Sequence, residues 1–91
     1  MTHNVREKNK LLARVRRIRG QVEAIERALE AELGCAEVLQ VVASVRGAVN
    51  GLMAEVFEDH VRNHVFAPAL AANERAEGAD DLMDVVRAYL R

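Results

Sequence analysis

Four side chains of this sequence carry donor atoms that transition metals favour: His3, Cys35, His60 and His64. His60 and His64 are four residues apart, so on a helix both imidazole rings point from one face and can bind one ion. Cys35 is the only cysteine, and its thiolate belongs to the ligand class that separates transition metals from Mg²⁺ and Ca²⁺. These residues therefore predict a transition-metal site.

Each of these side chains also has a purely structural interpretation. A lone cysteine on an apolar helix face is most often a small buried hydrophobe. His60 and His64 share a stripe with Met53 and Phe57 and could lie at the edge of a core, with their polar tips in water. His3, close to the N-terminus, carries no weight by itself. Only a fold that brings the four together favours the metal site.

A row of basic and polar side chains forms a second candidate site on the first helix. We call Lys10, Arg14, Arg17 and Gln21 the basic row. Residues 1–21 hold seven basic residues and one acidic residue, a local charge of +6 in a chain of net charge −1. The row has almost no acidic residue in its own turns, which favours contact with DNA phosphates over a merely solvated charged face. Aromatic residues make up 3% of the chain, too few to stack on single-stranded bases, so duplex DNA is the predicted partner.

The elements that must position these residues are helices. Apolar residues recur every three or four positions in two stretches, which predicts one helix over 5–31 and another over 35–66. The two apolar seams are Leu11, Val15, Ile18, Val22, Ile25 and Leu29, and then Cys35, Val38, Val42, Val45, Val49, Leu52 and Val56. Glu32, Leu33 and Gly34 make the break between the helices, with Gly34 as the stop signal.

The remaining residues predict a connector and a last helix. Pro68 and the stretch that follows it to Gly78 are typical of a connector. Asp80 can cap a short C-terminal helix with an apolar face. Because no segment alternates like a strand, the sequence predicts an all-α fold, a long antiparallel hairpin plus a short third helix, in a single domain over 1–91.

The predicted hairpin separates the candidate metal ligands. Cys35 and His60 are 25 residues apart on one helix, about 37 Å at 1.5 Å per residue, so one chain cannot bring both to one ion. If two copies of the second helix run antiparallel about an axis near residues 47–50, Cys35 of one chain meets His60 and His64 of the other. The geometry therefore predicts a site shared between two chains.

Two further features fit this shared site. Small residues from Gly47 to Gly51 lie where the two backbones would cross, and small side chains allow a close approach. A hairpin with its bend at 33–34 also places His3 beside residue 64 of its own chain. The N-terminal amine and three histidines would then come from one chain, and the cysteine from its neighbour.

Length and composition exclude several classes of protein. Ninety-one residues bury little apolar surface alone, which favours helices that pack against partner chains. The N-terminus has no apolar signal segment and no apolar run approaches the ~18 residues of a membrane span, so we expect no membrane contact and a cytoplasmic, reducing location. Val61 stands where an HExxH hydrolase has its glutamate, which argues against a metal-dependent enzyme. A structural helical oligomer that binds acidic partners remains an alternative.

The chain resembles the CsoR/RcnR/FrmR repressors over nearly its whole length. The motifs are RVRRIRGQ at 14–21, Cys35, VRGAVNGLMAEVFEDH at 45–60 and the closing VRAYLR. The resemblance implies a dimer of antiparallel hairpins that assembles into a disc-like tetramer. It also implies repression of an operator with a G-tract and flanking inverted repeats, which is lost when an inducer binds.

The resemblance also assigns residues to the two sites. Cys35, His60 and His64 match the family's sensor positions, whereas Arg14, Arg17, Gln21 and Arg46 match positions implicated in DNA contact. The nickel/cobalt branch of the family uses an N-terminal amine, a histidine at position 3 and the same three sensor residues. This chain has that whole set, with the amine of Thr2 if Met1 is removed. Mixed nitrogen and sulfur ligands in more than four positions suit Ni(II) and Co(II) better than a closed tetrahedral zinc site.

The other branches of the family differ from this chain at the same sensor positions. The copper branch has a second cysteine at the position of His64, and the persulfide branch requires one at the position of His60. The stretches RVRRIRGQ, GLMAEV and VRAYL resemble the formaldehyde branch, which joins a Cys35 thiolate to an N-terminal proline amine, but residue 2 is Thr here. We therefore predict a repressor released by Ni(II) or Co(II) that controls a metal-efflux gene and has no small-molecule substrate. Formaldehyde is the alternative, and zinc or copper a second one.

Overall fold

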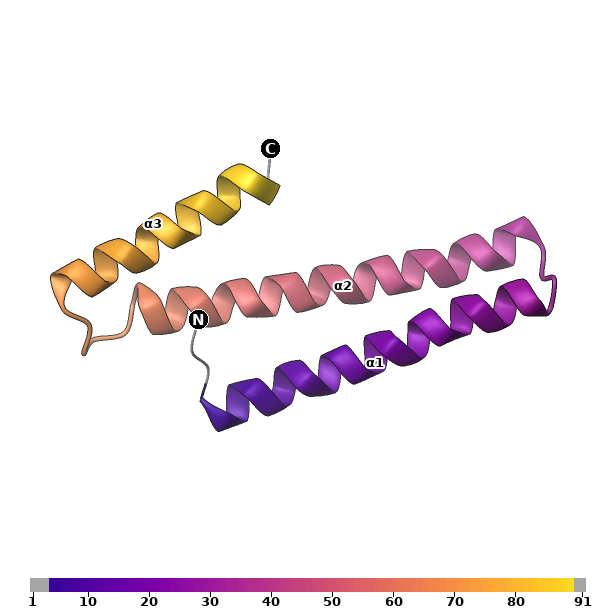
Figure 1. Ribbon diagram of the computed structural model, residues 1–91, viewed down its shortest axis with the longest axis horizontal. Coiled ribbons are helices and arrows are strands. Elements are labelled where there is room, and N and C mark those ends of the chain that lie inside the picture. Colours follow the sequence, from indigo (N-terminus) through magenta and orange to yellow (C-terminus); the bar gives the residue numbers. More distant parts are fainter. Residues whose placement is uncertain (1–3, 90–91) are drawn as a thin grey trace.

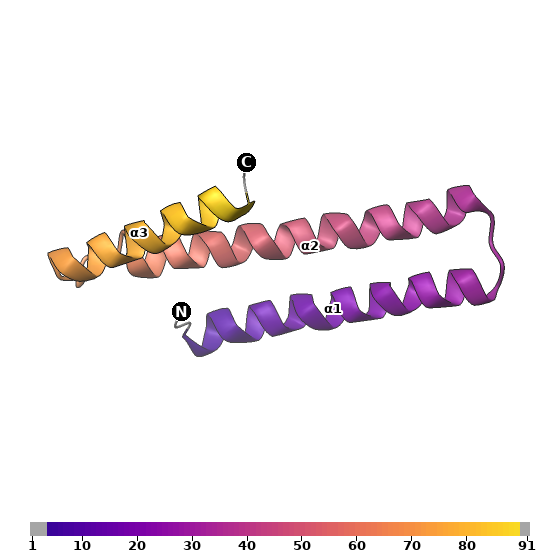
Figure 2. The same cartoon turned by 45° about the horizontal axis from the view of Figure 1, so that its top comes forward.

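The structure of the chain is a computed structural model that describes residues 4–89. It contains three helices within that range, α1 (Val5–Glu30), α2 (Cys35–His64) and α3 (Ala72–Tyr89), and no strand. α1 and α2 form a long antiparallel hairpin, and α3 lies on the other side of α2 from α1, beside its C-terminal half (Figures 1 and 2). The predicted all-α fold with a hairpin and a third helix is confirmed.

The residue that stops α1 at the hairpin turn differs from the one that the sequence predicts. The N–H of Leu33 donates to the carbonyl of Ala28 at 3.1 Å, and the N–H of Glu32 donates to that of Leu29 at 3.1 Å. This pair of bonds closes the helix, and it requires one residue in the left-handed region. That residue is Glu32, with φ of 55°, whereas Gly34 has φ of −63° and begins α2 as its N-cap. Gly34 is therefore not the stop residue.

The third helix begins well before Asp80, where the sequence predicts its cap. Its first turn is closed by Glu74, whose Oε1 accepts the N–H of Ala71 at 2.9 Å. Gly78 is not part of a connector, because it lies buried within α3 where the helix crosses the end of α2. A Cβ atom at Gly78 would lie 1.9 Å from the carbonyl oxygen of His64. The glycine permits a close approach of the two helix backbones.

The protomer has little interior of its own. Its radius of gyration is 17.4 Å, whereas a compact chain of this length has about 12 Å. Its accessible surface is 6892 Å², whereas a compact monomer of this mass exposes about 5,300 Å². Within residues 4–89, the buried residues are Ala28, Asp59 and Gly78. The protomer therefore leaves much of its surface uncovered, and packing of the helices against partner chains stays a prediction.

About half of each predicted apolar seam stays exposed. Leu11, Ile18 and Ile25 are partly covered between α1 and α2. The exposed members are Val15, Val22 and Leu29 of α1, and Cys35, Val42 and Val49 of α2, and Met53 beside the second seam is exposed too. At 100° per residue these side chains lie on the flank of the hairpin away from Arg14 and Glu55. We call this surface the apolar flank. None of the described helices is long and apolar enough to cross a bilayer.

Candidate functional site

His60 and His64 lie together on the last two turns of α2. Their ring centroids are 5.0 Å apart and the rings stack with an interplanar angle of 30°, as their spacing predicts. Nε2 of His60 lies 2.9 Å from the carbonyl oxygen of Gly78. Because a carbonyl only accepts, this ring nitrogen donates, and the lone pair of the neutral ring is on Nδ1. Nε2 of His64 is buried and has no hydrogen-bond partner within the part of the chain that the structure describes.

Cys35 lies at the opposite end of the same helix. It is the first residue of α2 and is exposed, about 37 Å along the helix axis from His60. His3 lies outside the described residues. Within residues 4–89, no group of three or more His, Cys, Asp or Glu side chains is placed to hold a metal ion. Among the described residues, one protomer therefore brings His60 and His64 together and leaves Cys35 apart from them.

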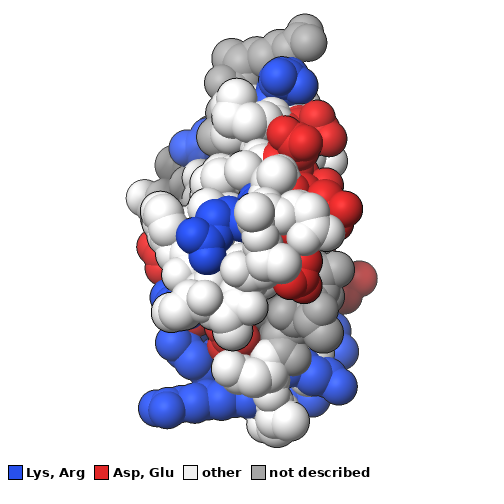
Figure 3. All heavy atoms as spheres, turned by 90° about the vertical axis from the view of Figure 1, so that its left-hand side faces the viewer, with Lys and Arg blue, Asp and Glu red and all other residues white. Residues whose placement is uncertain are grey.

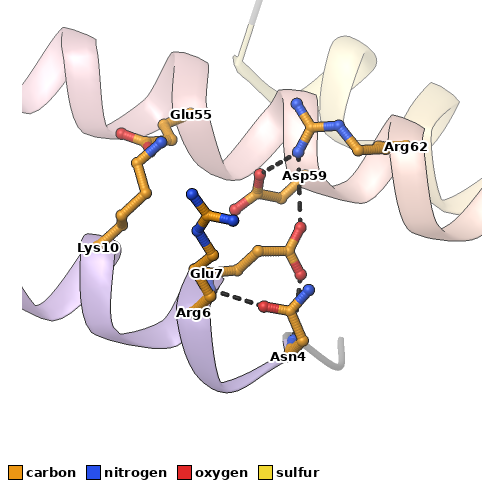
Figure 4. A pocket seen from close by; sticks show the side chains of 7 residues that line it. All are labelled: Asn4, Arg6, Glu7, Lys10, Glu55, Asp59 and Arg62. Atoms are coloured by element: carbon orange, nitrogen blue, oxygen red, sulfur yellow. Dashed lines mark hydrogen bonds and ion pairs between the residues drawn. The ribbon is translucent and has the colours of Figure 1, made fainter.

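An ion network joins the start of α1 to the turn of α2 that carries the histidines (Figure 4). Oε1 of Glu7 accepts the backbone N–H of Asn4 at 3.1 Å and the side-chain amide of Asn63 at 3.0 Å. Nη1 of Arg62 lies 3.5 Å from Glu7 and 3.0 Å from Asp59, whose side chain is 7% exposed. Because Asn63 lies between the two histidine positions, this network fixes the N-terminus of α1 beside them.

Sequence reasoning missed this network, although one signal for it was present. Asn4 and Glu7 have the spacing of a capping box, and both of its hydrogen bonds are formed. The box predicts where α1 begins. It does not predict that Glu7 also contacts Asn63 and Arg62, because those contacts depend on the register of the hairpin.

Two members of the basic row have an acidic partner on α2. Glu55 lies 3.3 Å from Nζ of Lys10 and also pairs with Nε of Arg14. The side chains are 70% exposed for Lys10, 42% for Arg14 and 14% for Glu55, so the carboxylate lies beneath both cations. Partial burial alone would raise the pKa of Glu55. The hydrogen bonds and charges of Lys10 and Arg14 outweigh it and hold that pKa below its ordinary value of 4.5.

The rest of the basic row lines a groove between α1 and α2. The groove has a volume of about 240 Å³ and is lined by Arg14, Arg17, Ile18, Gln21, Ser44 and Ala48. Nε2 of Gln21 donates to Oγ of Ser44 at 3.4 Å, so this side chain bridges the two helices. The structure thus places the basic row on one side of the hairpin. Viewed from the end, Lys and Arg gather at the height of α1, whereas Asp and Glu lie mostly higher (Figure 3).

Arg46 does not join the basic row within one protomer. It is exposed on α2, nine residues before Glu55, which places it about half a turn around the helix axis from that residue. Arg46 therefore lies on the side of α2 that carries Met53 and the apolar flank.

The sequence and fold are similar to those of known repressors. Residues 7–88 match the family of metal-sensitive transcriptional repressors. An uncharacterised protein in the bioA 5′ region of Serratia marcescens is 54% identical over 91 residues, all of both chains. The transcriptional repressor RcnR of Salmonella paratyphi B is 42% identical, again over 100% of both chains.

A solved structure has a fold similar to that of this chain. A variant of the formaldehyde-responsive regulator FrmR from Salmonella enterica serovar Typhimurium has a TM-score of 0.86 and 45% identity, covering 97% of this chain and 99% of that one. The resemblance read from the sequence motifs is confirmed. This family is described as one of metal-sensitive transcriptional repressors, which bind DNA and are not enzymes. This chain belongs to the metal-sensitive transcriptional repressor family.

Proposed function

We propose that this protein represses a metal-efflux gene and leaves its operator when Ni(II) or Co(II) binds. The observation that carries the choice of a metal is the histidine pair. The two rings stack at 5.0 Å, and Nε2 of His64 is buried without a partner among the described residues. A buried polar atom without a partner is costly, and a bound metal ion would use its lone pair. Imidazole nitrogen is also a ligand that Ni(II) and Co(II) favour.

The complete site would combine two chains. His60 and His64 would come from one chain with His3 and the amine of Thr2, and Cys35 from its neighbour. Two antiparallel copies of α2 would bring them together, since Cys35, Val42, Val49 and the histidines share one side of that helix. The exposed apolar residues between its ends provide the surface for this pairing, and assembly into a tetramer would follow from the same hairpins. The metal would supply a fixed charge that links the two subunits.

The pairing does not use Gly51 as its small-residue contact. A Cβ atom built at Gly51 points toward Nη1 of Arg14, at 3.1 Å, and so faces α1 within the same chain. The residues that would face a second copy of α2 are Val42, Val49 and Met53, which are exposed. Gly51 therefore leaves room for the Arg14 side chain within the hairpin, and the proposed pairing rests on aliphatic side chains.

On the DNA side, the basic row would bind phosphates of a double-stranded operator. Lys10, Arg14 and Arg17 lie along one side of the hairpin, where positive charge attracts the backbone of duplex DNA. Gln21 is already bonded to Ser44, so it would contribute mainly to the shape of the groove. Arg46 would contact DNA only if the assembly brings a second protomer's surface beside the row.

A formaldehyde sensor is the second candidate. The similar FrmR structure and the exposure of Cys35 favour it, because an exposed thiol is accessible to a small electrophile. In that case the amine of Thr2 would be the second reacting group. Zn(II) and Cu(I) are the further metals to compare.

One titration tests these alternatives together. The wild-type protein first selects duplexes from a random-sequence library, and fluorescence anisotropy then follows its release from a selected duplex. We expect Ni(II) and Co(II) to weaken DNA binding, and His64→Ala to abolish that effect. Cobalt-bound protein should show a thiolate charge-transfer band that is absent from Cys35→Ala. Release by formaldehyde, with no response to either metal, would replace the metal proposal by the formaldehyde one.

A further inference from the structure

Arg14 lies against α2, where it pairs with Glu55 and passes close to Gly51. Its Nε pairs with the carboxylate of Glu55, and its Nη1 lies close to Gly51, where an added Cβ atom would come within 3.1 Å. Both contacts involve an arginine that is still 42% exposed. The guanidinium group therefore crosses α2 in a defined position and keeps N–H donors that are free of the Glu55 pair.

Holding Arg14 in one position should favour its binding to a phosphate. A long flexible side chain loses rotamer freedom when it contacts DNA, and this loss weakens binding. An arginine already held by a partly buried carboxylate has lost part of that freedom in the free protein. The carboxylate lies beneath the cations, with 14% of its side chain exposed, so an incoming phosphate meets Lys10 and Arg14 first.

We propose that Glu55 and Gly51 form a seat that positions Arg14 for phosphate contact, which makes both of them positioning residues for DNA binding. The proposal rests on the DNA-binding role proposed above. It has a direct competitor, in which Glu55 merely neutralises Lys10 and Arg14 and keeps them from DNA. The two interpretations predict opposite signs when the acidic charge is removed.

The first experiment removes one negative charge from either of two neighbouring positions. Glu55→Gln and Glu58→Gln change the net charge equally, and both residues line the same shallow hollow beside Arg14. We expect Glu55→Ala to weaken binding to the selected duplex about tenfold, as for the loss of one charge-assisted hydrogen bond. Glu55→Gln, which still offers a neutral acceptor, should weaken it less, while Glu58→Gln should not weaken it. A Glu55→Gln protein that binds DNA more tightly than wild type would overturn the proposal.

The second experiment disturbs the seat without changing any charge. Gly51→Ala places a methyl group against Nη1 of Arg14, whereas Gly47→Ala meets nothing within 4 Å in the described chain. Both substitutions favour the helix. We expect Gly51→Ala to fold at least as stably as wild type. It should nevertheless bind DNA several-fold more weakly, a loss below the about 1.4 kcal/mol that corresponds to tenfold. Equal DNA affinity in the two glycine variants would count against the seat.

A third measurement needs no DNA. The Nε–H proton of Arg14, followed by NMR, should exchange with water more slowly in wild type than in Glu55→Gln. A double variant tests the same point with DNA present. In the Arg14→Ala background, Glu55→Gln should have little further effect on DNA affinity. Equal exchange rates would show that no seat exists. A wild-type protein that selects no duplex would reject the proposed repressor function instead, and the exchange rates would still decide whether Glu55 holds Arg14.

Discussion

Two glycines inside helices have opposite surroundings. Gly78 is buried against the end of α2, and a Cβ atom there would lie 1.9 Å from the carbonyl oxygen of His64. Gly20, on the exposed side of α1, has nothing within 4 Å of such an atom in the described chain. Gly20→Ala should therefore stabilise the fold by about 1 kcal/mol. Gly78→Ala should destabilise it by about 1–3 kcal/mol through the backbone clash.

Urea unfolding of the two variants at one protein concentration measures both changes. In Gly78→Ala, separation of α3 should also remove the acceptor of His60, which changes the NMR shifts of that ring. If both substitutions stabilise the protein to the same extent, the contact between α3 and the end of α2 does not exist in solution.

Arg17 provides the simplest test of the basic row. It lines the groove beside Gln21 and Ser44, far along the hairpin from the histidine pair. Arg17→Ala should weaken DNA binding without changing metal affinity. The slope of log K against log salt should decrease in magnitude by about 0.9, the value for one lost phosphate contact. An unchanged slope and affinity would leave Arg17 as part of a solvated face.

The ion pairs of Glu55 should make stability depend on pH in acid. The pKa of Glu55 in the folded chain lies below 4.5, because Lys10 and Arg14 favour the charged form. The stabilisation is therefore present above pH 4.5 and disappears as the pH falls through the lowered value. Urea unfolding of wild type and Glu55→Gln should differ at neutral pH and converge in acid. A difference that grows on acidification would contradict this assignment.

At the scale of the elements, apolar periodicity predicted α1 and α2 well. Their observed bounds, Val5–Glu30 and Cys35–His64, are close to the predicted 5–31 and 35–66. Periodicity works here because both helices carry a continuous apolar stripe, whether or not one protomer covers it. The start of α3 was wrong because its N-cap position holds Ala71, which has no capping side chain, and because Gly78 is typical of connectors. The glycine is explained by a contact with α2 that is distant in sequence.

The turn between α1 and α2 yields a prediction from backbone geometry. Glu32 has φ of 55°, a conformation that costs a side-chain-bearing residue roughly 1–2 kcal/mol and glycine almost nothing. Glu32→Gly should therefore stabilise the hairpin by up to about 1 kcal/mol. As the control, Glu26→Gly in the interior of α1 should destabilise it by about the same amount. Thermal unfolding that shows a loss in both variants would reject the left-handed assignment.

At the scale of the whole molecule, the candidate site was only partly predictable. The i,i+4 spacing was enough to bring His60 and His64 together, since it depends on one helix alone. Cys35 could be excluded from the same protomer's site by counting residues along α2. The partner of Arg14 could not be predicted, because Glu55 depends on how the two helices are aligned. The position of Arg46 relative to the basic row could not be predicted either, because it depends on the assembly.

Mixed oligomers test whether the sensor site is shared. Neither Cys35→Ala nor the double variant His60→Ala/His64→Ala should have an intact site alone. When the two proteins are refolded together, one site of a mixed dimer should have the wild-type cysteine and both wild-type histidines. In the other site, the cysteine and both histidines are replaced by alanine. Cobalt titration should therefore recover up to one site per mixed dimer, half of the wild-type number. Mixed dimers that form and still bind no cobalt would reject the antiparallel pairing.

The large surface of the isolated protomer makes its stability a matter of mass action. The excess over a compact monomer is about 1,600 Å², and the apolar flank is among the exposed surfaces. If folding is completed only when another copy covers this flank, the folded fraction rises with the total amount of protein. Dilution would then release chains in a form open to proteolysis, as free subunits often are. The number of repressor molecules would thereby set their own lifetime, and a chain made in excess over its partners would be removed first.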